Sequence, residues 1–245
     1  MNGHTSFRSG NPSLNKNTFK SFSASSENQM TLDGTVNKTG ISLLILMLTA
    51  TYTWNSPSPG LMMIGGIGGF IVAMITIFKR HLSAITVPIY AALEGLMLGG
   101  VSMMFEQLYP GIVSQAIFLT FGILASLLLA YKSGLIKPTE NFKLGVAAAT
   151  GGIAIIYLMS WVMNFWGGSI PLIHSSSTFG ILFSVGVIII ASLNLVLDFD
   201  FIEQGTEMGA PKYMEWYGAF GLMVTLIWLY LEILRLLAKL NSRRN

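Results

Sequence analysis

Seven apolar runs, each close to the length that crosses a bilayer, constrain this chain more than any motif in it. A membrane-spanning helix needs about 20 mostly apolar residues. The runs cover Val36–Trp54, Leu61–Phe78, Ile85–Phe105, Ile112–Tyr131, Leu144–Trp166, Thr178–Leu197 and Tyr217–Ala238. None alternates with the two-residue period of a barrel strand, and backbone groups in hydrocarbon must be paired internally. The sequence therefore predicts an all-α polytopic membrane protein, a bundle of seven transmembrane helices.

The composition supports a membrane protein and excludes other classes. Hydrophobic residues make up 52% of the 245-residue chain and charged residues only 10%. The net charge of +3 is spread along the sequence without a basic patch, so we expect no nucleic-acid partner. Cysteine is absent, which excludes disulfides, thiol nucleophiles and thiolate metal sites.

Three segments follow from this pattern. Residues 1–35 are rich in Asn, Ser, Thr and Gly and predict a flexible cytoplasmic tail. Residues 36–238 form the transmembrane domain, and residues 239–245 form a short basic C-terminal tail.

The basic residues predict the orientation of the chain. The N-terminal tail and alternate loops carry ten Lys and Arg residues, whereas loops 55–60, 106–111 and 167–177 carry none. Positive charge collects on the cytoplasmic side, so we expect the N-terminus there. Seven crossings would leave Lys239, Arg243 and Arg244 outside. Either the last run crosses in spite of these charges, or it is re-entrant and returns to the cytoplasmic side.

An acid in the middle of the third run is the first candidate site. Glu94 would lie at a depth where a carboxylate costs roughly 2.5–3.5 kcal/mol on insertion scales. A basic partner such as Arg80, a proton, a water-filled cavity or a cation must compensate it. Gly95 and Gly99 have the small-xxx-small spacing that lets two helices approach closely. We interpret Glu94 as a pore-facing carboxylate, with a buried ion pair or hydrogen bond as the alternative.

A second group of acids follows the sixth run: Asp198, Asp200, Glu203 and Glu207. Carboxylates at a pore mouth suit Ca²⁺, with Asp198 and Asp200 as candidate metal ligands, and crowded carboxylates also exchange protons near neutrality. Asp198 and Asp200 would nevertheless point about 200° apart on a helix. The alternative is an ordinary solvated loop. Glu232, in the last run, stands three residues before Arg235, a spacing typical of an ion pair.

Several stretches resemble the Bax-inhibitor/YccA-like family of transmembrane proteins. The third run reads Tyr90-Ala-Ala-Leu-Glu94-Gly-Leu-Met-Leu-Gly99, close to that family's Tyr-Ala-x-x-Glu-Gly-Leu-x-Leu-Gly signature. Residues 11–19 and 30–39 look like a bacterial branch of the family, and residues 197–202 fall where it has Tyr-Asp-Thr-x-x-Ile. The resemblance covers essentially the whole chain and implies a bacterial inner-membrane location.

The resemblance also implies a function and a pair of residues. It implies a seven-helix bundle with a pH-sensitive calcium leak that two aspartates close. Asp198 matches the first aspartate, whereas Thr225 stands where the family has the second. Glu232 could substitute for the missing acid, but it lies two turns, about 10 Å, further along a helix.

Two functions from different classes remain open. The first is a pH-sensitive cation leak channel with Ca²⁺ as the transported ion and no resident cofactor. The second is a non-conducting regulator that binds other membrane proteins in stress or survival control. We do not expect an enzyme, because the sequence lacks HExxH and the usual intramembrane protease motifs, and its three histidines lie in separate segments.

Overall fold

The computed structural model describes residues 28–168, 173 and 175–244, and this part of the chain is almost entirely helical. The long helices are α2 (Leu32–Asn55), α3 (Pro59–Phe78), α4 (Ser83–Leu108), α5 (Ile112–Lys132), α6 (Glu140–Phe165), α8 (Thr178–Glu207) and α9 (Met214–Arg244). A single 3₁₀ turn, η2 (Arg80–Leu82), precedes α4. Within the described ranges, the only β pairing is one isolated bridge between Gln29 and Pro211. The all-α prediction is confirmed.

The helices follow the seven apolar runs and extend beyond several of them. α8 continues ten residues past the predicted end at Leu197, so the acids after that run lie on a helix and not in a loop. α9 is uninterrupted over 31 residues, about 46 Å at 1.5 Å per residue. A helix of that length exceeds the roughly 30 Å hydrocarbon core. The re-entrant interpretation of the last run is therefore wrong.

Both predicted tail boundaries move outward. Leu32–Thr35 belong to α2, and the side chain of Thr31 caps this helix by accepting a hydrogen bond from Gly34 N at 3.0 Å. Met30 is also buried, with 2% of its surface exposed. Residues 1–27 of the predicted tail lie outside the described residues. At the other end, α9 includes most of the segment assigned to the C-terminal tail.

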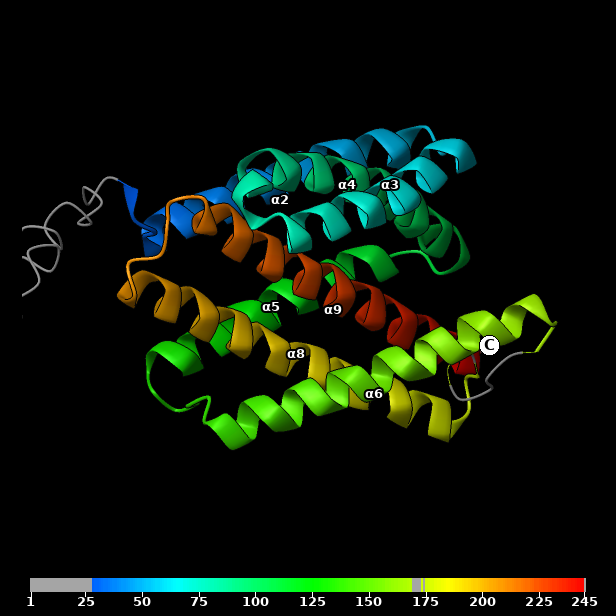
Figure 1. Cartoon of the computed structure of the whole chain (residues 1–245). Coiled ribbons are helices and arrows are strands. Elements are labelled where there is room, and N and C mark those ends of the chain that lie inside the picture. Colours follow the sequence, from blue (N-terminus) through cyan, green and yellow to red (C-terminus); the bar gives the residue numbers. More distant parts are fainter. Residues whose placement is uncertain (1–27, 169–172, 174, 245) are drawn as a thin grey trace, which may run out of the picture.

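α9 lies at the centre of the bundle. Figure 1 shows it between α2 and α4 on one side and α5 and α8 on the other, and it contacts all four. α3 packs on α4 and α6 packs on α8, at the periphery. In its most apolar 18-residue stretch, α9 is 50% buried inside the bundle, whereas α3 and α6 are each 17% buried. Residues of α9 are therefore the best placed to line any internal space.

Two glycines allow α4 to approach α2 closely. A Cβ on Gly95 would collide with Thr49 Oγ1 and Leu46 O of α2, and one on Gly99 would collide with Ala50 O and Thr53 Oγ1. The predicted packing role of Gly95 and Gly99 agrees with this geometry.

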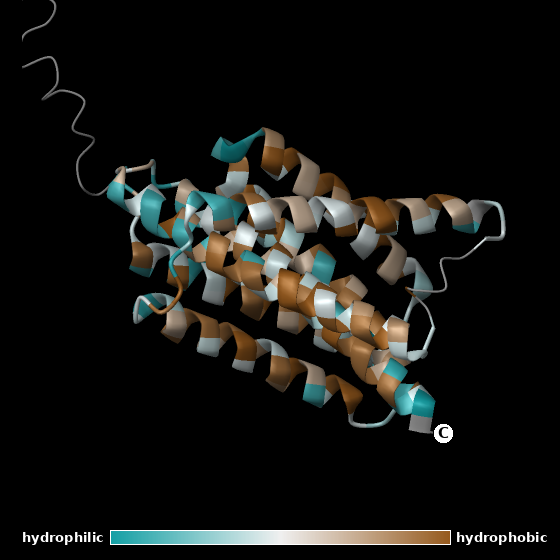
Figure 2. Cartoon of the chain, turned by 90° about the horizontal axis from the view of Figure 1, so that it is seen from below, coloured by the Kyte–Doolittle hydropathy of each residue, from teal (hydrophilic) through white to brown (hydrophobic). Residues whose placement is uncertain are grey.

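The outer surface suits a lipid environment. Six of the described helices are long and apolar enough to cross a membrane: α3, α4 with η2, α5, α6, α8 and α9. Figure 2 shows apolar residues along these helices and hydrophilic ones gathered mainly toward their ends. α2 is long enough but less apolar, because it carries Asp33, Asn37 and Lys38 near its start and several threonines. Their hydroxyls are bonded to carbonyls of the same helix, as Thr49 Oγ1 is to Ile45 O at 3.1 Å.

Candidate functional site: a cavity lined by two carboxylates

A cavity of about 810 Å³ lies between α3, α4, α8 and α9. It occupies the half of the bundle nearer the start of α2, because its lining runs from Tyr217, early in α9, to Thr225. Glu94 and Asp198 line the same cavity from α4 and α8. The structure thus brings Glu94, Asp198 and Thr225 together in one cavity. The sequence analysis had selected these residues from three separate segments.

Glu94 is held at mid-depth by a glycine and a tyrosine. It stands eleven residues after the start of α4 and is 8% exposed. Tyr90, one turn earlier on α4, places its hydroxyl beside the Glu94 carboxylate. A Cβ on Gly69 of α3 would come within 2.7 Å of Glu94 Oε1, so only glycine leaves room for the carboxylate there. The Glu94 carboxylate therefore faces Tyr90, Gly69 and the cavity.

Asp198 faces α9 across the cavity. Its carboxylate lies beside the side chain of Thr225, while Oδ2 is buried and makes no hydrogen bond. Oδ1 lies over Gly221, where an added Cβ would be 3.4 Å away. A buried carboxylate oxygen without a donor is costly. A proton, a cation or an ordered water at Oδ2 would remove that cost.

Aromatic side chains line the cavity beside these acids. Tyr217 packs on Phe220 at 6.1 Å, and Phe220 packs edge-on against Tyr90 at 5.0 Å between ring centroids. The guanidinium of Arg80 lies 5.3 Å from the Tyr217 centroid. Arg80 is exposed and makes no ion pair with Glu94, so its predicted role as the charge partner of that acid is wrong.

Asp200 does not join Asp198. It pairs with Lys143 of α6 at 2.9 Å and accepts a hydrogen bond from Gln204 at 2.6 Å. The helix that continues through both residues points them to different sides, and Asp200 does not line the cavity. Within the described ranges, no group of three or more His, Asp or Glu side chains could hold a metal ion. The predicted Ca²⁺ site at Asp198 and Asp200 is not formed.

Glu232 belongs to a different polar cluster, toward the other end of α9. It is 1% exposed, pairs with Arg235 at 2.8 Å and accepts a hydrogen bond from the Tyr157 hydroxyl at 2.7 Å. The predicted pair of Glu232 and Arg235 is confirmed. Glu232 is absent from the cavity lining, so it does not replace the missing second aspartate.

Lys239 is another residue whose surroundings differ from the prediction. The sequence placed it in a basic tail, yet it is 5% exposed. It donates to Gly180 O at 2.9 Å and Ser184 Oγ at 2.8 Å, both on α8. It therefore fastens the end of α9 to the start of α8.

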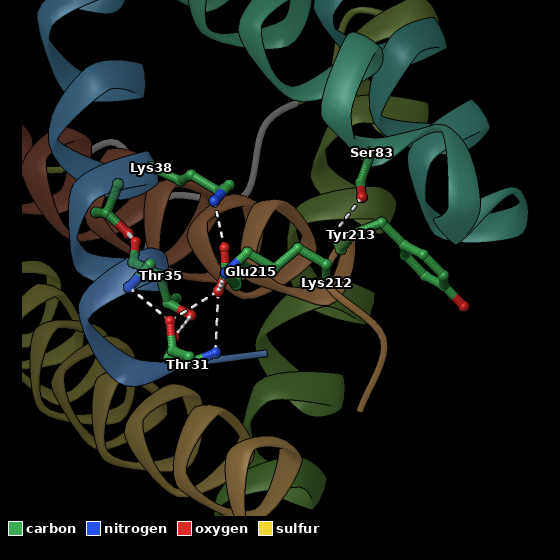
Figure 3. A network of polar contacts seen from close by, with 9 residues as sticks. Thr31, Thr35, Lys38, Ser83, Lys212, Tyr213 and Glu215 are labelled. Carbon is green, nitrogen blue, oxygen red and sulfur yellow. Dashed lines mark hydrogen bonds and ion pairs between the residues drawn. The ribbon is translucent and has the colours of Figure 1, made fainter. Parts of the chain in front are cut away.

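The sequence analysis missed the Glu215 network, which consists of Glu215, Thr31, Lys38 and Lys212 (Figure 3). Glu215 is fully buried in the first turn of α9. Its Oε1 accepts from Thr31 N and Thr31 Oγ1 at 2.9 and 2.8 Å and pairs with Lys212 at 3.1 Å, while Oε2 pairs with Lys38. A Cβ on Gly34 would collide with this carboxylate. The spacing of Lys212 and Glu215 was a local signal, but the contact with Lys38, 177 residues away, was not visible.

These observations define a class of protein: a polytopic, all-α membrane protein with a carboxylate-lined cavity among four of its helices. A family model described as Bax inhibitor 1 like matches residues 11–242. The chain therefore belongs to the Bax inhibitor 1 like family, as its third run and acidic segment suggested. Comparisons with curated proteins and with solved structures return no match.

Proposed function

We propose that this protein is a cation leak channel that conducts Ca²⁺ through the cavity between α3, α4, α8 and α9. Glu94 and Asp198 would bind the ion in turn and set its passage by their protonation. Thr225 would contribute a hydroxyl where the family carries a second aspartate.

One observation carries this proposal: two carboxylates from different helices line one cavity at membrane depth. An ionised acid inside a bilayer is expensive and is typical of ion or proton pathways. Apolar side chains at these two positions would fill the same space without that cost. The unpartnered Asp198 Oδ2 adds support, because it leaves a free position for a cation or a proton.

Protonation would act on few groups. The titratable residues that line the cavity are Glu94, Asp198, Tyr90 and Tyr217, and Arg80 lies over the Tyr217 ring. In this proposal, both acids attract a cation when ionised and release it when protonated. Flux would therefore fall as the pH is lowered through the range in which they take up protons.

The topology of the proposal is seven crossings with the N-terminus in the cytoplasm. Lys38 and Lys212 meet at Glu215 near the start of α2 (Figure 3), Arg80 lies over Tyr217 early in α9, and Lys143 pairs with Asp200 late in α8. This basic end agrees with the ten-to-none asymmetry of the sequence. α2 would be the first crossing although its hydropathy is lower, because it lies along α4. A bacterial inner-membrane location remains a prediction.

Flux into liposomes that contain a calcium dye tests the proposal. Glu94→Gln and Asp198→Asn should each lower Ca²⁺ flux about tenfold, the effect of losing roughly 1.4 kcal/mol of cation stabilisation. Asp200→Asn is the matched control, because it neutralises an acid two residues away that lies outside the cavity, and its flux should equal that of the parent.

Two outcomes would contradict the proposal. Parent flux equal to that of empty liposomes at every pH would leave the non-conducting regulator as the better account. Equal losses in all three variants would show that the effect comes from general charge and not from the cavity. Repeating the assay with sodium and proton gradients would identify the ion.

A further inference from the structure

A second cavity, of about 550 Å³, lies in the other half of the bundle. Its walls are α2 and α5, and its floor is formed by α4 and α9, including Leu226 and Tyr230. It begins near Trp54 at the end of α2 and reaches Leu43 near the middle of that helix. We call this space the α2–α5 groove.

The α2–α5 groove opens sideways between its two walls. α2 packs along α4 and α9, but α2 and α5 do not form a packed pair. Residues at its rim are exposed: Met47 on α2 by 54%, and Ile117 and Phe121 on α5 by 40% and 42%. In a helix bundle that spans a membrane, this opening faces the acyl chains of the bilayer.

The polar side chains of the groove already have partners. Thr51 and Thr120 donate to the carbonyls of Met47 and Ala116, each at 2.8 Å. Ser102 Oγ and the Tyr230 hydroxyl share a hydrogen bond of 2.6 Å. A buried water needs two to four polar partners. The groove offers few free ones, so its chemistry favours an apolar occupant.

The length of the groove fits one leaflet. Leu43 and Asn55 are twelve positions apart, about 18 Å along a helix, compared with about 15 Å for half of the hydrocarbon core. Trp54 stands at the end where a tryptophan suits the membrane interface. Loops 55–60 and 106–111 beside this end contain no Lys or Arg to bind a phosphate. Recognition would therefore depend on the chain and not on the headgroup.

We propose that the α2–α5 groove binds one acyl chain of a phospholipid from the leaflet on the side of the α2–α3 loop. The chain fills the space between α2 and α5 and packs on Leu226 and Tyr230 of α9. Leu226 is the neighbour of Thr225, so the lipid supports the part of α9 that borders the carboxylate cavity. This inference does not depend on ion conduction.

Native mass spectrometry of the detergent-solubilised protein with dioleoylphosphatidylcholine tests the inference. The parent should retain one lipid per chain. Ile117→Trp places a larger side chain at the rim and should weaken retention about tenfold, the effect of displacing roughly two methylenes. Phe118→Trp is the matched control, because Phe118 is 78% exposed on the same helix and does not line the groove.

Further arms separate the alternatives. Dihexanoylphosphatidylcholine, whose acyl chains are short, should not be retained. Dioleoylphosphatidylglycerol, which differs only in its headgroup, should be retained to the same extent as dioleoylphosphatidylcholine. Met47→Trp repeats the test from α2 in case Ile117→Trp lowers the melting temperature. The inference is overturned by equal retention in parent, groove and control variants, by retention that follows headgroup charge, or by a dimer without bound lipid.

Discussion

The carboxylate cavity and the α2–α5 groove are both lined by α4 and α9 but are suited to opposite occupants. The cavity contains Glu94, Asp198 and a buried carboxylate oxygen without a donor. The groove contains hydroxyls that are all paired and otherwise apolar side chains. The cavity is larger than the groove, about 810 Å³ against about 550 Å³, but what distinguishes their occupants is whether the polar groups are satisfied. An unsatisfied acid at membrane depth requires a proton or a cation, whereas a satisfied apolar wall requires only lipid.

The largest change in stability should come from the Glu215 network. This network lies in the half of the bundle that contains the carboxylate cavity and not in the half that contains the groove. Glu215→Ala leaves Lys38 and Lys212 without their buried partner and should cost about 3 kcal/mol of stability. We expect a lower melting temperature in detergent and reduced Ca²⁺ flux, with lipid retention in the groove unchanged among folded molecules.

Glu140→Ala is the control for that change. Glu140 is 85% exposed and pairs only with Lys143, so its loss should change stability by less than about 0.5 kcal/mol. Equal melting temperatures for the two variants would show that the Glu215 network does not hold α2 to α9.

A smaller change in stability should distinguish a glycine in close contact with a neighbouring helix from one without such a contact. Gly99→Ala forces α2 away from α4 at the groove and should destabilise the protein by about 2 kcal/mol, as overpacking does. Gly122→Ala has no neighbour within 4 Å and should stabilise α5 by about 0.5 kcal/mol. Thermal unfolding of the two variants checks this. Shifts of the same sign would argue against close contact between α2 and α4.

The smallest effect tests whether Thr225 belongs to the ion site. Thr225→Asp adds a third carboxylate to the cavity and should tighten Ca²⁺ binding about tenfold, because affinity follows the number of charged ligands. Equilibrium binding of radioactive calcium measures the change. Val224→Asp is the matched comparison: Val224 also lines the cavity but is 39% exposed, against 8% for Thr225, so its added carboxylate should tighten Ca²⁺ binding less. Equal or weaker binding by Thr225→Asp than by the parent would place the ion elsewhere.

The helices were predictable because each depends on a local run of apolar residues. Their ends were less so. α8 continues past Leu197 through acids that looked like a loop, because Asp200 and Glu203 find partners on Lys143 and Tyr131. α2 begins before the predicted boundary because Thr31 and Met30 are held by segments near Glu215. Such contacts join residues far apart in the sequence and leave no periodic signal.

Sequence patterns were enough to predict the all-helical membrane class, the family, the distinct character of Glu94 and Asp198, and the pairing of Glu232 with Arg235. Only the tertiary structure decided that Glu94, Asp198 and Thr225 line one cavity, that Asp200 and Glu232 lie outside it, and that Glu215 joins α2 to α9. The reason is physical. Hydropathy and i,i+3 spacing act within one helix, whereas the surroundings of a buried charge depend on which helices pack against it.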